Sequence, residues 1–196
     1  MGAGLAVCVA FAVFVAGCAT QGTQTSASRQ VGSSREGFCL GWGSGSFDYS
    51  GKSVKRCLAI GKDPNASDGE GKSVLMFAAF LDQTESIRLL LDAGADVDRQ
   101  DDLGATALIA AALQGHIEAL RVLVEAGADV DRQTTDGSTA LMGAALFGRM
   151  EAARLLLKAG ADVNKRNADG YTAVVAAEGS GYTEIVTLLE KYQKEK

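Results

Sequence analysis

Residues 94–97 read Gly-Ala-Asp-Val, and the same four residues return at 127–130 and at 160–163. The step between copies is 33 residues each time. A Thr-Ala pair keeps this step, at 106–107, 139–140 and 172–173. A fixed period of this length indicates a stack of structural repeats, in which each unit buries its apolar face against its neighbours.

The residues within one period predict two helices. Thr106 precedes the run Ala107 to Gln114 and can cap a first helix through its hydroxyl group. Gly115 permits the left-handed backbone conformation that ends such a helix. The apolar residues of the stretch 117–125 surround much of a second helix, as expected for a helix stacked between neighbours. Gly127 then ends this second helix.

From about Ser53 to the end, the sequence resembles the ankyrin-repeat family. Its Thr-Pro-Leu-His opening is altered, because Ala107 and Ile109 stand at the Pro and His positions. The resemblance implies an all-α solenoid of paired antiparallel helices joined by hairpin loops. We expect about four repeats within 67–196, a Gly-rich segment and N-terminal half-repeat cap at 37–66 with its helix at 54–60, and a polar C-terminal cap from Tyr182. The four units are 67–99, 100–132, 133–165 and 166 onward.

The first residues predict an exported protein. Gly2 to Gly17 carries no charge and is too short for a typical membrane-spanning helix, which needs about 20 residues. Its end, Val15-Ala16-Gly17-Cys18, resembles the lipobox of bacterial lipoproteins, which implies a signal peptide at 1–17 and a lipid on Cys18. An uncleaved anchor helix is the alternative.

The residues after Cys18 predict a tether and a location. Residues 18–36 contain almost nothing apolar to bury, so we expect a flexible tether. Ala19 stands where an Asp would retain a lipoprotein at the inner membrane. By this resemblance the chain belongs to the cell envelope, faces the periplasm and is anchored by lipid to the outer membrane.

The remaining cysteines, Cys39 and Cys57, are a pair in an oxidising compartment if the chain is exported. We therefore expect a disulfide between them. The alternative is a free Cys57 in the core with an unrelated Cys39, because spacing alone does not fix connectivity.

The sequence offers few parts for catalysis or ion binding. His116 is the only histidine, and a structural role in the turn after the first helix is the better interpretation. Two Gly-Lys-Ser stretches lack the preceding Gly of a phosphate-binding loop. The Asp pairs 96/98 and 129/131 lack the Gly and the distal Glu of a calcium loop and recur with the repeat. We expect no enzyme activity, no cofactor and no metal site.

The resemblance places partner binding on a concave face built from hairpin tips and the ends of the first helices. The tip positions include Leu103, Ser138 and Tyr171. The pairs that end the first helices are Phe80/Leu81, Leu113/Gln114, Leu146/Phe147 and Gly179/Ser180. Five of these eight positions carry a large apolar side chain, which predicts an exposed interaction surface. The alternative is that some of them belong to the core.

Composition agrees with a soluble binding module. The chain of 196 residues is 47% hydrophobic and has a net charge of −5 without a strongly basic stretch, which argues against a nucleic-acid partner. We therefore expect a monomeric, membrane-tethered scaffold that binds a protein. Two settings stay open: an immunity or inhibitor role, and an envelope-stress role. The rivals are a small enzyme built on the Gly-rich segment 38–50, and a purely structural spacer.

Overall fold

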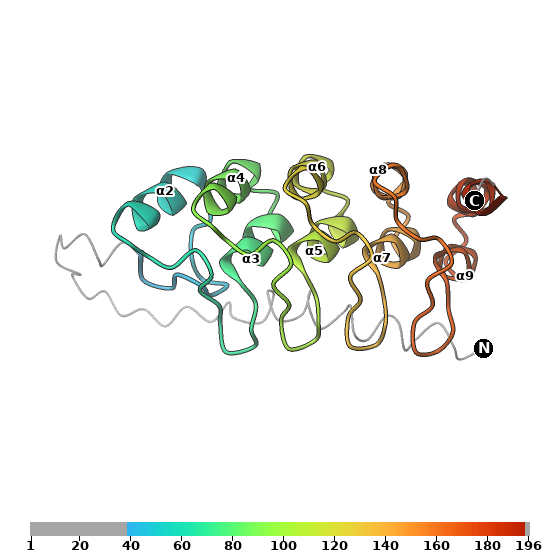
Figure 1. The fold of residues 1–196 in the computed structure, drawn as a ribbon, viewed down its shortest axis with the longest axis horizontal. Coiled ribbons are helices and arrows are strands. Elements are labelled where there is room, and N and C mark those ends of the chain that lie inside the picture. The colour runs from blue at the N-terminus through green and yellow to red at the C-terminus, as the bar shows by residue number, and fades with distance from the viewer. Residues whose placement is uncertain (1–38, 195–196) are drawn as a thin grey trace.

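The computed structural model describes residues 39–194, and within this range all regular structure is helical (Figure 1). An inner row contains α3 (Val74–Phe80), α5 (Ala107–Gln114), α7 (Ala140–Leu146) and α9 (Ala173–Gly179). An outer row contains α2 (Gly51–Ala59), α4 (Thr84–Asp92), α6 (Ile117–Glu125), α8 (Met150–Lys158) and α10 (Thr183–Lys194). Four hairpin loops extend from the same edge of the stack (Figure 1). The predicted all-α solenoid is confirmed.

The inner helices all begin in the same way. A hydroxyl oxygen at the N-cap accepts a hydrogen bond from the backbone nitrogen three residues further on, over 3.2–3.4 Å. The four capping residues are Ser73, Thr106, Thr139 and Thr172. Each such cap stabilises its helix by about 1 kcal/mol.

The core lies between the two rows and follows the 33-residue period. Alanines of the inner helices, such as Ala111 and Ala144, are fully buried. Their short side chains let neighbouring helices pack closely. The outer helices fill the remaining space with one leucine per repeat, none of which is exposed to solvent: Leu90, Leu123, Leu156 and Leu189.

The N-terminal end of the stack is closed by an irregular segment rather than by an inner helix. Tyr49 is 2% exposed and stacks on Phe77 of α3, with ring centroids 5.3 Å apart. The backbone carbonyl of Tyr49 accepts a hydrogen bond of 2.6 Å from Ser86 of α4. The helix expected at 54–60 forms as α2, but it begins three residues earlier, at Gly51.

Candidate functional site

The candidate binding face is the surface formed by the hairpin tips and the C-terminal ends of α3, α5 and α7. At the ends of α3, α5 and α7, the first residue of the pair is more buried than the second, whereas Gly179 and Ser180 at the end of α9 are both exposed. Leu81 is 46% exposed and Phe147 is 37% exposed, whereas Phe80 and Leu146 are half-buried. Gln114, the outward residue between them, is half-buried and polar. At the tips, Leu103 is exposed and Tyr171 half-buried.

Two residues expected on this face belong to the interior instead. Leu113 is only 6% exposed, because it is the inward residue of its pair on α5, which packs between α3 and α7. Ser138 is fully buried, and its hydroxyl donates a hydrogen bond of 3.0 Å to Asp136. The expected apolar row is therefore interrupted: Leu81 and Phe147 are separate exposed positions rather than ends of a continuous stripe.

The hairpin tips add negative charge to this face. Each tip has two turn residues, at 69–70, 102–103, 135–136 and 168–169. Together these eight positions contain four acidic residues and no basic one: Glu70, Asp102, Asp136 and Asp169. Glu70 pairs with the buried Lys72 over 2.5 Å, and this contact holds the pKa of Glu70 below its usual range. The surface is thus apolar and acidic.

One acidic group of the hairpins is buried. Asp101 accepts backbone hydrogen bonds from Leu103 and Ala105 at its Oδ1 atom, over 2.9 and 2.8 Å. Its Oδ2 atom is buried and has no hydrogen-bond partner. Burial raises the pKa of Asp101, although these hydrogen bonds and the charge of Lys72 act in the opposite direction.

The paired aspartates of the hairpins connect the repeats to one another. Oδ1 of Asp98 accepts a hydrogen bond of 2.9 Å from the backbone nitrogen of Asp129. Asp131 makes the same contact with the nitrogen of Asp162, again over 2.9 Å. These carboxylates stabilise the turns and the register between repeats. Among residues 39–194, no group of three or more potential ligands could hold a metal ion.

His116 also connects two repeats. Its Nε2 atom lies 3.1 Å from the backbone carbonyl oxygen of Phe80, at the end of α3. One repeat later, Arg149 donates a hydrogen bond of 3.0 Å from Nε to the carbonyl of Leu113. The equivalent geometry of the two side chains gives His116 a structural role at the junction of inner helices.

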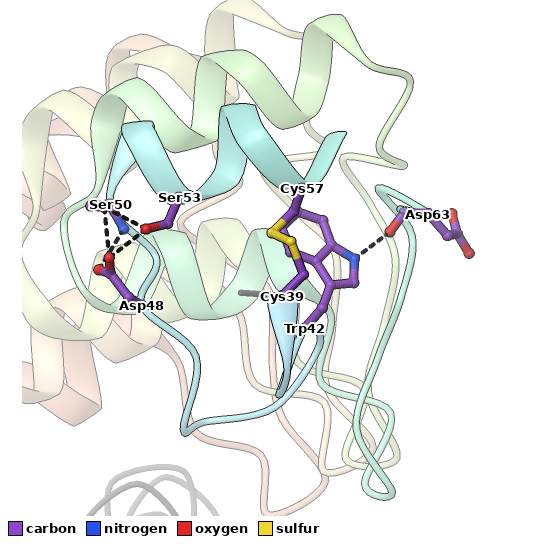
Figure 2. Close-up of a disulfide and its surroundings, with 7 residues drawn as sticks. All are labelled: Cys39, Trp42, Asp48, Ser50, Ser53, Cys57 and Asp63. Atoms are coloured by element: carbon purple, nitrogen blue, oxygen red, sulfur yellow. Dashed lines mark hydrogen bonds between the residues drawn. A yellow bond between two sulfur atoms is a disulfide. The ribbon is translucent and has the colours of Figure 1, made fainter. Parts of the chain in front are cut away.

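The cysteine pair and its surroundings fix the N-terminal segment onto α2 (Figure 2). Cys39 and Cys57 form a disulfide with Cα atoms 5.8 Å apart. Trp42 donates a hydrogen bond of 2.8 Å from its indole nitrogen to the carbonyl of Asp63. At the other end of α2, Asp48 accepts hydrogen bonds from Ser53 and Ser50, which hold its pKa below the usual range.

These contacts bear on the alternative hypothesis that the Gly-rich segment 38–50 forms an enzyme site. Cys39 is buried in its disulfide and has no thiolate to offer as a nucleophile. Tyr49 is buried and donates its hydroxyl hydrogen to the carbonyl of Ser44 over 2.8 Å. Asp48 and Trp42 are engaged in the contacts already described. The side chains of the segment thus hold the cap together.

Several expectations concern residues outside the described range. They are the signal peptide at 1–17, the lipid on Cys18 and the tether at 18–36. Among residues 39–194, no helix is long and apolar enough to cross a membrane.

Comparison with known proteins agrees with the repeat pattern. A family model of ankyrin repeats, spanning three copies, matches residues 46–134 and again 128–196. A comparison with curated proteins finds no match. Ankyrin repeats are protein-interaction modules and are generally not enzymes. Because the two matches cover most of the chain and coincide with the stacked helices, this protein belongs to the ankyrin-repeat family.

Proposed function

We propose that the chain is a non-enzymatic, lipid-anchored adaptor that binds a protein partner on the candidate binding face. The partner is envelope-localised, and the biological setting is an immunity or inhibitor role or an envelope-stress role. The membership of the ankyrin-repeat family supports the coarse part of this proposal, since such repeats serve as interaction modules.

The observation that carries the proposal is the chemistry of the candidate binding face. Within residues 39–194 seven large apolar side chains are exposed, and Leu81, Leu103 and Phe147 of the candidate binding face are three of them. Where a partner covers such large apolar side chains, they act as anchors of the interface. The four acidic turn residues of the hairpin tips add negative charge to this face. A complementary partner therefore presents apolar side chains among basic ones.

The test of partner binding compares variants in a pull-down from envelope extracts. L81S/F147S should lose a stoichiometric partner that the unmodified protein retains. V175S is the matched control, because Val175 of α9 is an exposed apolar residue outside the candidate binding face. Equal recovery of the partner by all three proteins would exclude this face as the interface.

The lipid anchor is the second part of the proposal, and the residues Val15-Ala16-Gly17-Cys18 support it. It places the protein at the cell envelope, facing the periplasm, on the outer membrane. Mass spectrometry of the mature N-terminus should find a lipid-modified Cys18. A mature chain that begins at any other residue would refute this part and leave the binding face untouched.

A further inference from the structure

The outward face of α2 is basic in an acidic protein. Lys52, Lys55 and Arg56 are exposed, whereas Ser53, Val54 and Cys57 are buried against the stack. The exposed residues stand three and four positions apart, so they share one side of the helix. The stretch 51–62 contains four basic residues and no acidic one, in a chain with a net charge of −5.

Two exposed aliphatic side chains lie at the end of the same helix. Leu40 is 67% exposed and Ile60 is 38% exposed. Leu40 directly follows Cys39, and Ile60 comes three residues after Cys57. The disulfide holds the Cα atoms of these cysteines 5.8 Å apart, so it also brings the two aliphatic residues to one region. We call Leu40, Lys52, Lys55, Arg56 and Ile60 the cap surface.

We propose that the cap surface docks onto a bilayer that contains anionic phospholipids. Lysine and arginine near such a bilayer are attracted to the negative headgroups, and exposed aliphatic side chains enter the boundary between headgroups and acyl chains. Lys52 and Lys55 form no ion pair within the described residues, so their charges are available to lipid.

The position of the cap surface in the chain favours a bilayer over other acidic partners. The cap surface begins at Leu40, 22 residues after Cys18, so a lipid on Cys18 delivers this end of the stack to the membrane. This argument about delivery rests on the proposed lipid anchor. The hairpin tips extend from the edge opposite the outer row (Figure 1), so docking leaves the candidate binding face accessible.

The first experiment is flotation of the full chain with vesicles of neutral phosphatidylcholine or of phosphatidylcholine mixed with phosphatidylglycerol. Binding should be stronger with the anionic vesicles, and K52E/K55E should reduce this additional binding by about tenfold. R121E/K158E changes net charge equally at exposed residues of α6 and α8 and should retain it. The additional binding should also weaken at high salt, which screens exposed charges.

Trp42 gives a second readout, because it is the only tryptophan of the chain and lies in the cap. Lipids with brominated acyl chains should quench its fluorescence in anionic vesicles, and L40S should diminish the quenching. Flotation with neutral vesicles tests the anchor alone. If the protein fails to bind neutral vesicles but still binds anionic vesicles, the anchor is refuted and the cap surface is supported. Equal binding of both vesicle types, unaffected by K52E/K55E, would overturn the cap surface.

Discussion

Gly104 lies against the backbone of Thr135 in the next repeat, and a Cβ atom at position 104 would stand 2.8 Å from the Thr135 nitrogen. The φ angle of Gly104 is +74°, a conformation that side chains rarely adopt. In the last hairpin, Gly170 has a φ angle of +80° but no neighbouring atom within 4 Å of a Cβ position. A side chain at Gly170 would therefore cause backbone strain alone. A side chain at Gly104 would cause the same strain and also a clash with the next repeat.

We predict that G104A destabilises the protein more than G170A does. G170A should cost about 1 kcal/mol from the left-handed conformation alone. G104A should cost about 2–4 kcal/mol, because it also forces apart two packed hairpins. Urea denaturation followed by circular dichroism measures both. Equal losses of stability in G104A and G170A would show that the two hairpins move apart at no cost in free energy.

Asp82 of the first repeat has a strained backbone conformation at a position that is glycine in the following repeats. Asp82 has a φ angle of +55°, and the residues that follow it at steps of 33 are Gly115, Gly148 and Gly181. D82G should raise the free energy of unfolding by about 0.5 kcal/mol, since relief of strain exceeds the greater freedom of glycine in the unfolded chain. D82N keeps the strain and removes the charge, so it should change stability little. If D82N raises the free energy of unfolding as much as D82G does, removal of the negative charge, and not relief of backbone strain, causes the gain.

The buried Asp101 predicts a pH dependence. Because burial raises the pKa of Asp101 in the folded state above its usual range, the folded protein binds this proton more tightly than the unfolded chain does. The free energy of unfolding of the unmodified protein should fall, relative to D101N, as pH rises through and above the usual pKa range of a carboxyl group. Denaturation at a series of pH values measures this difference.

The reciprocal control uses the last hairpin. Asn167 stands at the equivalent position, is equally exposed at 7%, and accepts the equivalent hydrogen bond from the nitrogen of Tyr171 over 2.8 Å. N167D should therefore acquire the pH dependence that D101N loses. Parallel stability profiles of D101N and the unmodified protein would contradict the assigned cause.

The disulfide should stabilise the cap. It closes a step of 18 residues, and restriction of the unfolded chain predicts a contribution of about 3 kcal/mol. C39S/C57S should unfold at lower urea concentration, and Trp42 fluorescence should report the loss because its indole packs against the same core. Thiol labelling of the non-reduced protein gives the direct check: stoichiometric labelling of both cysteines would refute the bridge.

The repeated part of the fold could be predicted from the sequence because each copy checks the others. The helix expected at 117–125 has those bounds, and Thr106 caps α5 while Gly115 ends it in the left-handed conformation. The cap helix follows the same period, because α2 begins at Gly51 and the other outer helices begin at 84, 117, 150 and 183. The irregular segment before it, 39–50, has no second copy, so no periodic pattern encodes contacts such as the hydrogen bond from Ser53 to Asp48.

The candidate binding face was harder to predict for a related reason. Two adjacent apolar residues end each of α3 and α7, and their pattern does not say which one points outward. Packing decides this: the first residue of each pair meets the neighbouring helices, so Leu113 is buried while Leu81 is exposed. Ser138 is buried because its hydroxyl bonds within the hairpin, which its polarity alone does not reveal.

This division between inward and outward residues predicts opposite outcomes for two substitutions on the inner helices. F147S removes an exposed side chain and should weaken partner binding by about 1–3 kcal/mol with little change in stability. L113S removes a buried side chain and should lower the free energy of unfolding by about 2–5 kcal/mol, while the folded fraction binds normally. Denaturation and binding are measured on the same preparations. A large loss of stability in F147S, with its binding intact, would move Phe147 from the interface into the core.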